Sequence, residues 1–389
     1  MVLSFESRRL SLLPPYLFAR LDAQKREALA AGVDVIDFGV GDPDLPSPDE
    51  AVAALCEAAK HSKNHRYPPY RGTLEFREAC ARWLLTRHEV RIDPETEVLG
   101  LIGSKEGLAH LALGIVNSSD VVLCPDPGYP VYLASTILAG GEPFRIPLLA
   151  ERGFLPDLSA VPQKIVERAS LMFLNYPNNP TGACASASFL NEAVGFARAN
   201  DMVVCHDAAY IDVALEGPKQ KCMLATCRDK SNIIELFSFS KTFNMTGWRV
   251  AFAAGDPELI SALGKVKTNL DSGAFMPIQT AVIEAMQKCD DFPNRMGEVY
   301  RERRDILLPA LAKAGIDAKP PRAAFYVWGR IRKDIGSATL AEQILARCGI
   351  LAAPGVAFGR HGEGYLRFSL TLSTERVREA ADRLSRVSF

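Results

Sequence analysis

Residues 238–249, SFSKTFNMTGWR, lie between two strand-like runs. Lys241 is therefore expected on a loop just beyond the end of a strand, among small hydroxyl residues and aromatic ones. Burial disfavours the charged form of a lysine, and the neutral amine can attack an aldehyde to form a Schiff base. Ser238 offers a hydroxyl and Arg249 a planar guanidinium, both suited to a phosphate. The stretch predicts a site for an aldehyde that carries a phosphate, which is pyridoxal phosphate (PLP). A lysine on a polar loop and an arginine in a surface ion pair are the alternative that this stretch alone leaves open.

The composition indicates a globular chain of two domains. The chain has 389 residues, of which 48 % are hydrophobic and 23 % charged, too long for one ordinary core. A formal net charge of -1 gives no electrostatic basis for binding nucleic acid or an anionic membrane, and no apolar run is long enough to span a bilayer. The N-terminus does not have the pattern of a signal peptide. The nine cysteines are scattered singly, without metal-binding spacing. We therefore expect a cytoplasmic protein with reduced thiols and no metal site.

Short apolar runs alternate with helical periodicity between about residues 97 and 255. The alternation predicts a largely parallel sheet with helices on both faces, in which ligands bind beyond the carboxyl ends of the strands. The predicted strands are Val98–Ile102, Val121–Cys124, Leu171–Leu174, Val203–Cys205, Ile233–Phe237 and Val250–Ala253, and the helices between them include about 104–117, 130–139 and 186–200.

The flanking segments predict a smaller α+β domain. Before the sheet we expect a short helix that runs towards Ala31 and a strand at 35–38. A helix that Ser47 and Glu50 cap as a capping box should follow and end near residue 60. After about residue 256 we expect mainly helices to about 314, then strands near 324–328 and 365–370 and helices near 339–348 and 374–388. The expected division is an arm and part of the small domain in 1–45, a large PLP-binding domain in 46–285 and a small domain in 286–389.

Polar or glycine-rich motifs follow five of the predicted strands. They are Gly103-Ser104-Lys105, Asp126–Pro130, Asn175–Gly182, His206–Tyr210 and the stretch that holds Lys241. Each motif alone is typical of a turn, but five motifs at one rim of a sheet indicate a binding site. The first of them, at the start of a helix, favours an anion. We expect His110 and His206 to be structural.

These motifs resemble those of the PLP-dependent aminotransferases of class I and II, which have fold type I. The resemblance is carried by Asn178–Gly182, Asp207–Tyr210, Ser238–Lys241 with Arg249, and Arg367 within Tyr365–Ser369. Order and spacing fit over nearly the whole chain. The resemblance implies an α/β fold with a mostly parallel seven-stranded sheet flanked by helices, a smaller α+β domain, and a homodimer with shared active sites that acts on amino acids and 2-oxo acids.

The resemblance also implies a role for individual residues. Lys241 would hold PLP and move a proton at the substrate Cα, and Asp207 would pair with the pyridine nitrogen. Tyr210 and Asn179 would bond the ring hydroxyl oxygen. The other implied contacts are Tyr129 on the ring face, Ser104, Lys105, Ser238 and Arg249 on the phosphate, Tyr67 on the phosphate of the neighbouring subunit, Arg367 on the substrate carboxylate, and Gly41, Asn179 and Tyr16 near the substrate.

Within this family the chain most resembles the bacterial LL-diaminopimelate aminotransferases. The resembling stretches are 13–18, 39–46, 126–132, 175–182, 244–249 and 269–275. They imply transfer of an amino group between LL-2,6-diaminopimelate and 2-oxoglutarate, a step of lysine biosynthesis. Two positions depart from that subgroup, Arg71 where an acidic residue is expected and Met276 where glutamine is expected. An aminotransferase for aspartate, alanine or glutamate, a PLP-dependent C–S β-lyase and a PLP-binding regulator are the alternatives.

Overall fold

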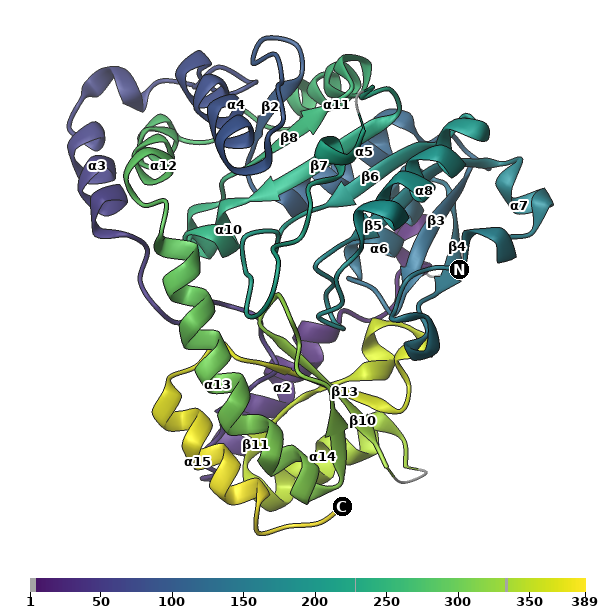
Figure 1. Ribbon diagram of the computed structural model, residues 1–389, viewed down its shortest axis with the longest axis vertical. Helices are drawn as coiled ribbons and strands as arrows, with labels where there is room; N and C mark the ends of the chain where they lie inside the picture. The colour runs from purple at the N-terminus through teal and green to yellow at the C-terminus, as the bar shows by residue number, and fades with distance from the viewer. Residues whose placement is uncertain (1–4, 228, 333–334) are drawn as a thin grey trace.

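The computed structural model describes residues 5–227, 229–332 and 335–389. Figure 1 shows two bodies, one built on a large sheet and one on a small sheet, with the long helix α13 (Phe292–Ala314) running from the first into the second. The α/β class predicted from the sequence is confirmed.

The large sheet has seven strands, as predicted, and their order is β2-β8-β7-β6-β5-β3-β4. The strands from β4 to β7 in this order are parallel, whereas β8 is antiparallel to both of its neighbours, β2 and β7. Six strands coincide with predicted runs and β4 does not, because it is a partly exposed edge strand that contains two prolines, which an edge tolerates. The bounds are β2 Val98–Leu101, β3 Val121–Asp126, β4 Glu142–Pro147, β5 Ala169–Asn175, β6 Val203–Asp207, β7 Ile233–Ser238 and β8 Ala251–Gly255.

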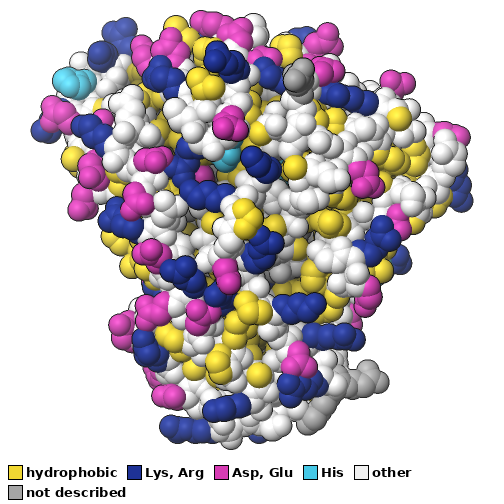
Figure 2. Space-filling view, in the orientation of Figure 1, with side chains coloured by type: hydrophobic (Ala, Val, Ile, Leu, Met, Phe, Trp, Pro, Cys, Tyr) yellow, Lys and Arg dark blue, Asp and Glu magenta, His cyan; other side chains and the backbone are white. Residues whose placement is uncertain are grey.

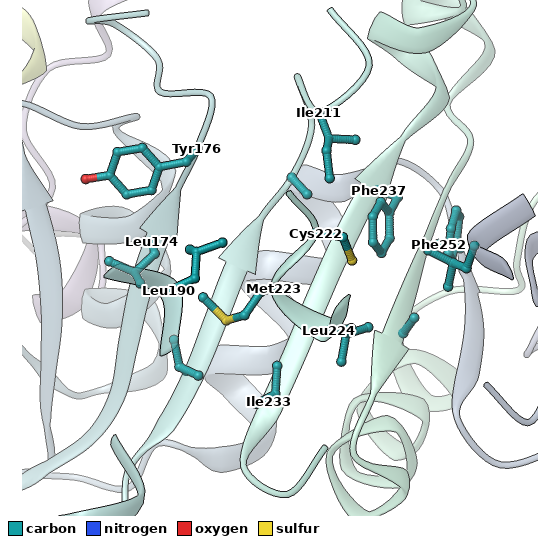
Figure 3. Packing of buried hydrophobic residues seen from close by; sticks show 14 of the residues in the cluster. Leu174, Tyr176, Leu190, Ile211, Cys222, Met223, Leu224, Ile233, Phe237 and Phe252 are labelled. Atoms are coloured by element: carbon teal, nitrogen blue, oxygen red, sulfur yellow. The ribbon is translucent and has the colours of Figure 1, made fainter. Parts of the chain in front are cut away.

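Both faces of this sheet are buried. Successive side chains of a strand point to opposite faces, and along β7 Ile233 and Phe237 pack into one hydrophobic core while Ile234 and Leu236 pack into another. Figure 3 shows the first core, where the ring of Phe237 stacks on that of Phe252 with 4.8 Å between centroids. Two packed faces hold the strand ends in fixed positions.

Helices cover these two faces. The long ones are α3 Asp49–Ala59, α4 Leu74–His88, α5 Ser104–Ile115, α6 Val131–Ala139, α8 Ala187–Ala199, α11 Pro257–Leu270 and α12 Met276–Lys288. Single-turn α-helices are α1 Arg8–Ser11, α7 Gln163–Val166, α9 Met223–Thr226 and α10 Phe239–Thr242. The 3-10 helices of the chain are η1 Ser62–His65, η2 Ala150–Arg152, η3 Leu158–Ala160, η4 Thr246–Trp248, η5 Gly355–Phe358 and η6 Arg360–Gly362.

The smaller body is an antiparallel sheet in the order β12-β13-β10-β9, with helices packed around it (Figure 1). Its strands are β9 Ile316–Ala318, β10 Tyr326–Ile331, β12 Ala353–Pro354 and β13 Tyr365–Ser369, and its helices include α2 Leu17–Ala30, α14 Ser337–Cys348 and α15 Thr374–Leu384. A two-stranded parallel pair, β1 Ile36–Asp37 with β11 Ile350–Leu351, ties the N-terminal segment to this body.

The capping box predicted for α3 is wrong. The residue at the N-cap is Pro48, and no side chain caps the helix within the described part of the chain. The hydroxyl of Ser47 instead donates to the carbonyl oxygen of Asn244 at 3.0 Å. The serine therefore ties the start of α3 to the loop that follows α10, a long-range contact that local spacing does not reveal.

A buried polar network connects β6 and β7. The backbone N–H of Tyr176 donates to Nε2 of His206 at 3.2 Å, so the ring proton is on Nδ1, which donates to Glu235 at 2.6 Å. Glu235 also accepts from the Cys222 thiol and from the N–H groups of Met223 and Leu224 at the start of α9. Burial raises the pKa of Glu235, but the bond from His206 and the other donors outweigh it and lower that pKa below its ordinary value.

The surface mixes charges of both signs. Figure 2 shows lysine and arginine side chains interspersed with aspartate and glutamate over both bodies on the side that faces the viewer. Within the described ranges, the structure contains no helix with the length and apolar character needed to cross a membrane.

Candidate active site

A cavity of about 470 Å³ lies at the carboxyl ends of β5, β6 and β7, where the two bodies meet. The motifs predicted to follow the strands do converge on it. Of the residues singled out from the sequence, the cavity is lined by Tyr16, Gly41, Ser104, Lys105, Tyr129, Asn179, Asp207, Tyr210, Ser238, Lys241 and Arg249. Arg367 adjoins the cavity through its contacts with two lining residues, and Tyr67 does not reach it.

Lys241 lies on α10, which follows β7 directly, so the expectation of a loop is wrong. The connection makes one helical turn because the N–H of Phe243 reaches the carbonyl of Phe239. The amine of Lys241 donates to the carbonyl oxygen of Gly41 at 2.8 Å and lies 5.5 Å from the centre of the Phe325 ring. Burial is the main cause that lowers the pKa of Lys241 to about 8, and Arg249 and Arg367 add to it. A substantial fraction of this amine is therefore neutral near pH 8.

Asp207 is the last residue of β6 and is almost fully buried. Its carboxylate accepts from the hydroxyl of Tyr132 at 2.8 Å and from the N–H of Ala209 at 3.3 Å. Burial raises the pKa of Asp207, while these two hydrogen bonds act against the shift. Tyr132 has no role in the sequence interpretation, because only the fold brings it to Asp207 from α6.

An anion-binding corner forms where α5 begins. Gly103 precedes the helix with φ +106°, and a Cβ there would lie 2.2 Å from Nη2 of Arg249. Arg249 itself has φ +56° and donates to the carbonyl of Thr246 at 2.8 Å. The helix start, Ser104 and Lys105 therefore face the same space as a guanidinium. Backbone N–H groups at a helix N-terminus and a guanidinium both favour an anion.

The mouth of this corner is bounded by aromatic rings. The amine of Lys105 donates to the hydroxyl of Tyr16 at 3.2 Å and lies 5.0 Å from the centre of that ring. Tyr129 also lines the cavity and meets Tyr132 edge to face, with 6.0 Å between centroids. Burial raises the pKa of Tyr129, so its hydroxyl stays protonated.

A buried arginine adjoins the cavity. Arg367, on β13, donates from Nη1 to Oδ1 of Asn179 at 2.9 Å and from Nη2 to the carbonyl of Gly39 at 2.5 Å. Its guanidinium lies 4.4 Å from the centre of the Tyr326 ring. The hydroxyl of Tyr326 in turn bonds that of Tyr210 at 2.8 Å. Tyr326 is a second residue that the sequence interpretation missed, since it lies outside every motif.

Gly41 closes the cavity beside this arginine. A Cβ on Gly41 would lie 2.1 Å from the hydroxyl oxygen of Tyr326, so only glycine fits at this position. The approach of this glycine to the substrate stays a prediction, and its carbonyl is the acceptor for the amine of Lys241.

Tyr67, Arg71 and Met276 lie away from the cavity within this chain. Tyr67 is 86 % exposed. Arg71 is half-buried and turned towards its own chain, with Nη2 3.4 Å from the carbonyl of Val98. Met276 is the first residue of α12 and is half-buried.

Comparison with known proteins gives the chain its relatives. The family model described as aminotransferase class I and II matches residues 33–384. The chain is similar to the LL-diaminopimelate aminotransferases of Syntrophobacter fumaroxidans (47 % identity over 384 residues, 99 % of each chain) and Aquifex aeolicus (45 % over 383 residues, 98 % of this chain and 99 % of the relative). Among solved structures, substrate-bound BacF from Bacillus subtilis superposes with a TM-score of 0.94 at 34 % identity, covering 99 % of this chain and 98 % of BacF. A probable N-succinyldiaminopimelate aminotransferase from Thermus thermophilus superposes with a TM-score of 0.90 at 37 % identity, covering 95 % of this chain and 99 % of the relative.

Proposed function

This chain belongs to the aminotransferases of class I and II, and we propose that it transfers an amino group between LL-2,6-diaminopimelate and 2-oxoglutarate. It is a PLP-dependent transaminase. The observation that carries the chemistry is one cavity that joins Lys241, Asp207 and the anion-binding corner at Arg249. The choice of substrate rests on the named activity of the relatives.

The residues of the cavity fit PLP. The anion-binding corner matches the phosphate, and the absence of a Cβ at Gly103 lets the guanidinium of Arg249 approach the helix start. The buried carboxylate of Asp207 matches a protonated pyridine nitrogen, since a buried charge needs a partner. Lys241 lines the same cavity and offers an amine to an aldehyde. When bound, PLP supplies that aldehyde and a ring that withdraws electrons from the substrate Cα.

The residues at the cavity then have separate roles. Lys241 holds a proton on Nζ or releases it near pH 8, which suits a group that takes a proton from the substrate Cα and returns it. The hydrogen bond from Tyr132 opposes the rise that burial causes in the pKa of Asp207, and so favours the carboxylate that would pair with the ring nitrogen. Arg367 binds the substrate carboxylate with its planar guanidinium, which Asn179 orients. Ser104, Lys105, Ser238 and Arg249 bind the phosphate, and Tyr129, Tyr210, Gly41 and Tyr16 bound the space for ring and substrate.

Attachment at Lys241 is tested chemically. The holoenzyme should be yellow, and borohydride should abolish its visible band and fix PLP on Lys241, which peptide mass spectrometry identifies. Attachment at another lysine would contradict the assignment.

A substrate comparison tests the reaction. We would measure kcat/KM for LL-diaminopimelate, glutamate, aspartate and alanine with one common 2-oxo acid. LL-diaminopimelate should be the best donor by at least about tenfold, which is about 1.4 kcal/mol of transition-state free energy. A site built for its distal ammonium and carboxylate leaves polar groups unpaired with shorter donors.

A second candidate is an aminotransferase for small amino acids. Arg71 and Met276 favour it, since both differ from the residues expected in the diaminopimelate subgroup. If aspartate or alanine equals LL-diaminopimelate in the same assay, this second candidate replaces the first.

We also propose a homodimer in which Tyr67 reaches the phosphate bound by the other subunit. Within one chain Tyr67 is almost fully exposed, and Tyr70 and Phe275 are exposed as well. The segments that hold Tyr70 and Phe275 are neighbours, since a Cβ at Gly273 would lie 3.3 Å from the carbonyl of Pro69. Such exposed aromatic side chains suit an interface. Sedimentation should show a dimer, and Tyr67→Phe should weaken PLP retention without unfolding the protein. A fully active monomer would refute the shared site.

A further inference from the structure

A second cavity, of about 630 Å³, lies between the small sheet and the loop that follows β5. It shares no lining residue with the active-site cavity. We call it the Trp328 cavity. Its lining includes Phe154, Thr181–Cys184, Lys319–Arg322, Trp328, Arg330 and Tyr365.

One wall of the Trp328 cavity is aromatic. The rings of Trp328 and Tyr365 stack with 5.1 Å between centroids and 7° between planes, and Phe154 meets Tyr365 edge to face at 6.2 Å. A wall of this kind favours a flat, apolar molecule.

A buried donor lies in this wall. Trp328 is only 6 % exposed, yet its indole Nε1 makes no hydrogen bond to any group in the described ranges of the chain. Buried N–H groups are normally paired, and an indole N–H can only donate. Nε1 is itself buried, so this unpaired donor lies behind the surface of the aromatic wall and does not open into the cavity.

The rim of the Trp328 cavity is cationic. Lys319, Arg322 and Arg330 are exposed, and none of them forms an ion pair with a carboxylate of the described residues. The acidic residue of the lining, Asp317, is already held by Arg332 at 2.7 Å. The free charge at the rim is therefore positive, which favours an anion.

We propose that the Trp328 cavity binds a small organic anion, with its flat apolar part against the aromatic wall and a carboxylate or phosphate towards the cationic rim. The site adjoins the carboxylate-binding end of the active site. Trp328 pairs with Arg367 across β10 and β13, and Thr181 lies two residues beyond Asn179, which bonds that arginine. Occupancy is therefore expected to change the KM for the amino donor; this kinetic effect, unlike binding itself, rests on the proposed function.

The test uses the PLP-loaded enzyme and the fluorescent anion 8-anilinonaphthalene-1-sulfonate. We expect saturable binding of one probe per chain. The double variant Lys319→Glu/Arg322→Glu should raise Kd at least tenfold, equivalent to about 1.4 kcal/mol, and Trp328→Phe, which makes the aromatic wall smaller, should raise it about threefold. Lys313→Glu makes half of that change of charge, as one substitution of the same kind at an exposed position of α13 outside the lining, and should leave Kd unchanged.

Competitors identify the head group. Displacement of the probe by indole-3-acetate supports a carboxylate, and displacement by phenyl phosphate supports a phosphate. The proposal is overturned if neither displaces it, if neutral indole does so equally well, if 2-oxoglutarate displaces it from the active site, or if the variants bind as the parent does. Should the double variant fail to fold, Arg330→Gln and Trp328→Phe carry the same comparison.

Discussion

Replacing Gly41 by alanine perturbs the closest packing at the active site. The new Cβ would lie 2.1 Å from Oη of Tyr326 and 2.8 Å from Cε1 of the same ring. Neither distance is tolerable, so the ring must move. Tyr326 is buried and its hydroxyl bonds Tyr210, so the movement both strains the packing and breaks that hydrogen bond.

The expected loss follows from these two effects. Overpacking of a buried site costs about 1–3 kcal/mol and a lost hydrogen bond about 1 kcal/mol, so Gly41→Ala should lower the free energy of unfolding by roughly 2–4 kcal/mol. The ring of Tyr326 also lies 4.4 Å from the guanidinium of Arg367. Loss of a buried cation–π contact, worth up to about 2 kcal/mol, should lower kcat/KM by up to roughly thirtyfold, mainly through KM.

Urea unfolding and steady-state kinetics with a saturating 2-oxo acid measure the two effects. Gly195→Ala is the matched control, since Gly195 lies within α8 and a Cβ there would meet no atom within 4 Å. In a helix, alanine is favoured over glycine by about 1 kcal/mol, so this variant should be as stable as the parent or more so. The reasoning is refuted if Gly41→Ala matches the parent in stability and kcat/KM.

Three further predictions concern buried groups. Between pH 8 and 10.5 Lys241 keeps a proton in the unfolded apoprotein that it lacks in the folded apoprotein. The free energy of unfolding of the apoprotein should therefore rise by up to about 3 kcal/mol across this range. In Lys241→Met this rise should vanish, and equal pH profiles for the parent and the variant would contradict the prediction. Tyr132→Phe should raise the pKa of Asp207 further and weaken PLP binding, most strongly at low pH, as fluorescence titration would show, whereas Tyr176→Phe, which removes a hydroxyl that bonds Phe154, should not. Glu235→Gln should destabilise the protein by about 2–3 kcal/mol at pH 7, and the gap should narrow as pH falls through the pKa of that carboxyl, because its stabilisation is lost on protonation; a constant gap in urea unfolding would count against this.

Much of the sheet could be predicted because its strands are buried on both faces. Such strands read as continuous apolar runs, and the motifs at their ends could be placed on one rim. β4 escaped because it lies at the edge, where Pro143 and Pro147 are tolerated. The single turn of α10 escaped because a four-residue helix has no periodicity to detect.

The site residues divide in a similar way. Those that follow strand ends were predicted, because the parallel order of the strands brings them together. Tyr132 and Tyr326 were not, since each acts through a partner far away in the chain, Asp207 and Tyr210 respectively. Ser47 shows the converse, a local capping pattern that a tertiary contact overrides.

The antiparallel pairing of β7 and β8 fixes both ends of the segment that connects them. Because the strands are neighbours, the chain leaves β7 at Ser238 and enters β8 at Ala251, where the two strands pair. Lys241 and Arg249 therefore lie on one short connecting segment whose two ends are fixed. The span between amine and guanidinium is then set by the number of residues on that segment. Inserting one residue between Lys241 and Arg249 would keep both side chains but change the distance and direction between the amine and the guanidinium. The two groups could then no longer bind the two ends of one rigid molecule together. Deletions and insertions between Lys241 and Arg249 should therefore damage the active site far more than substitutions of the residues between them.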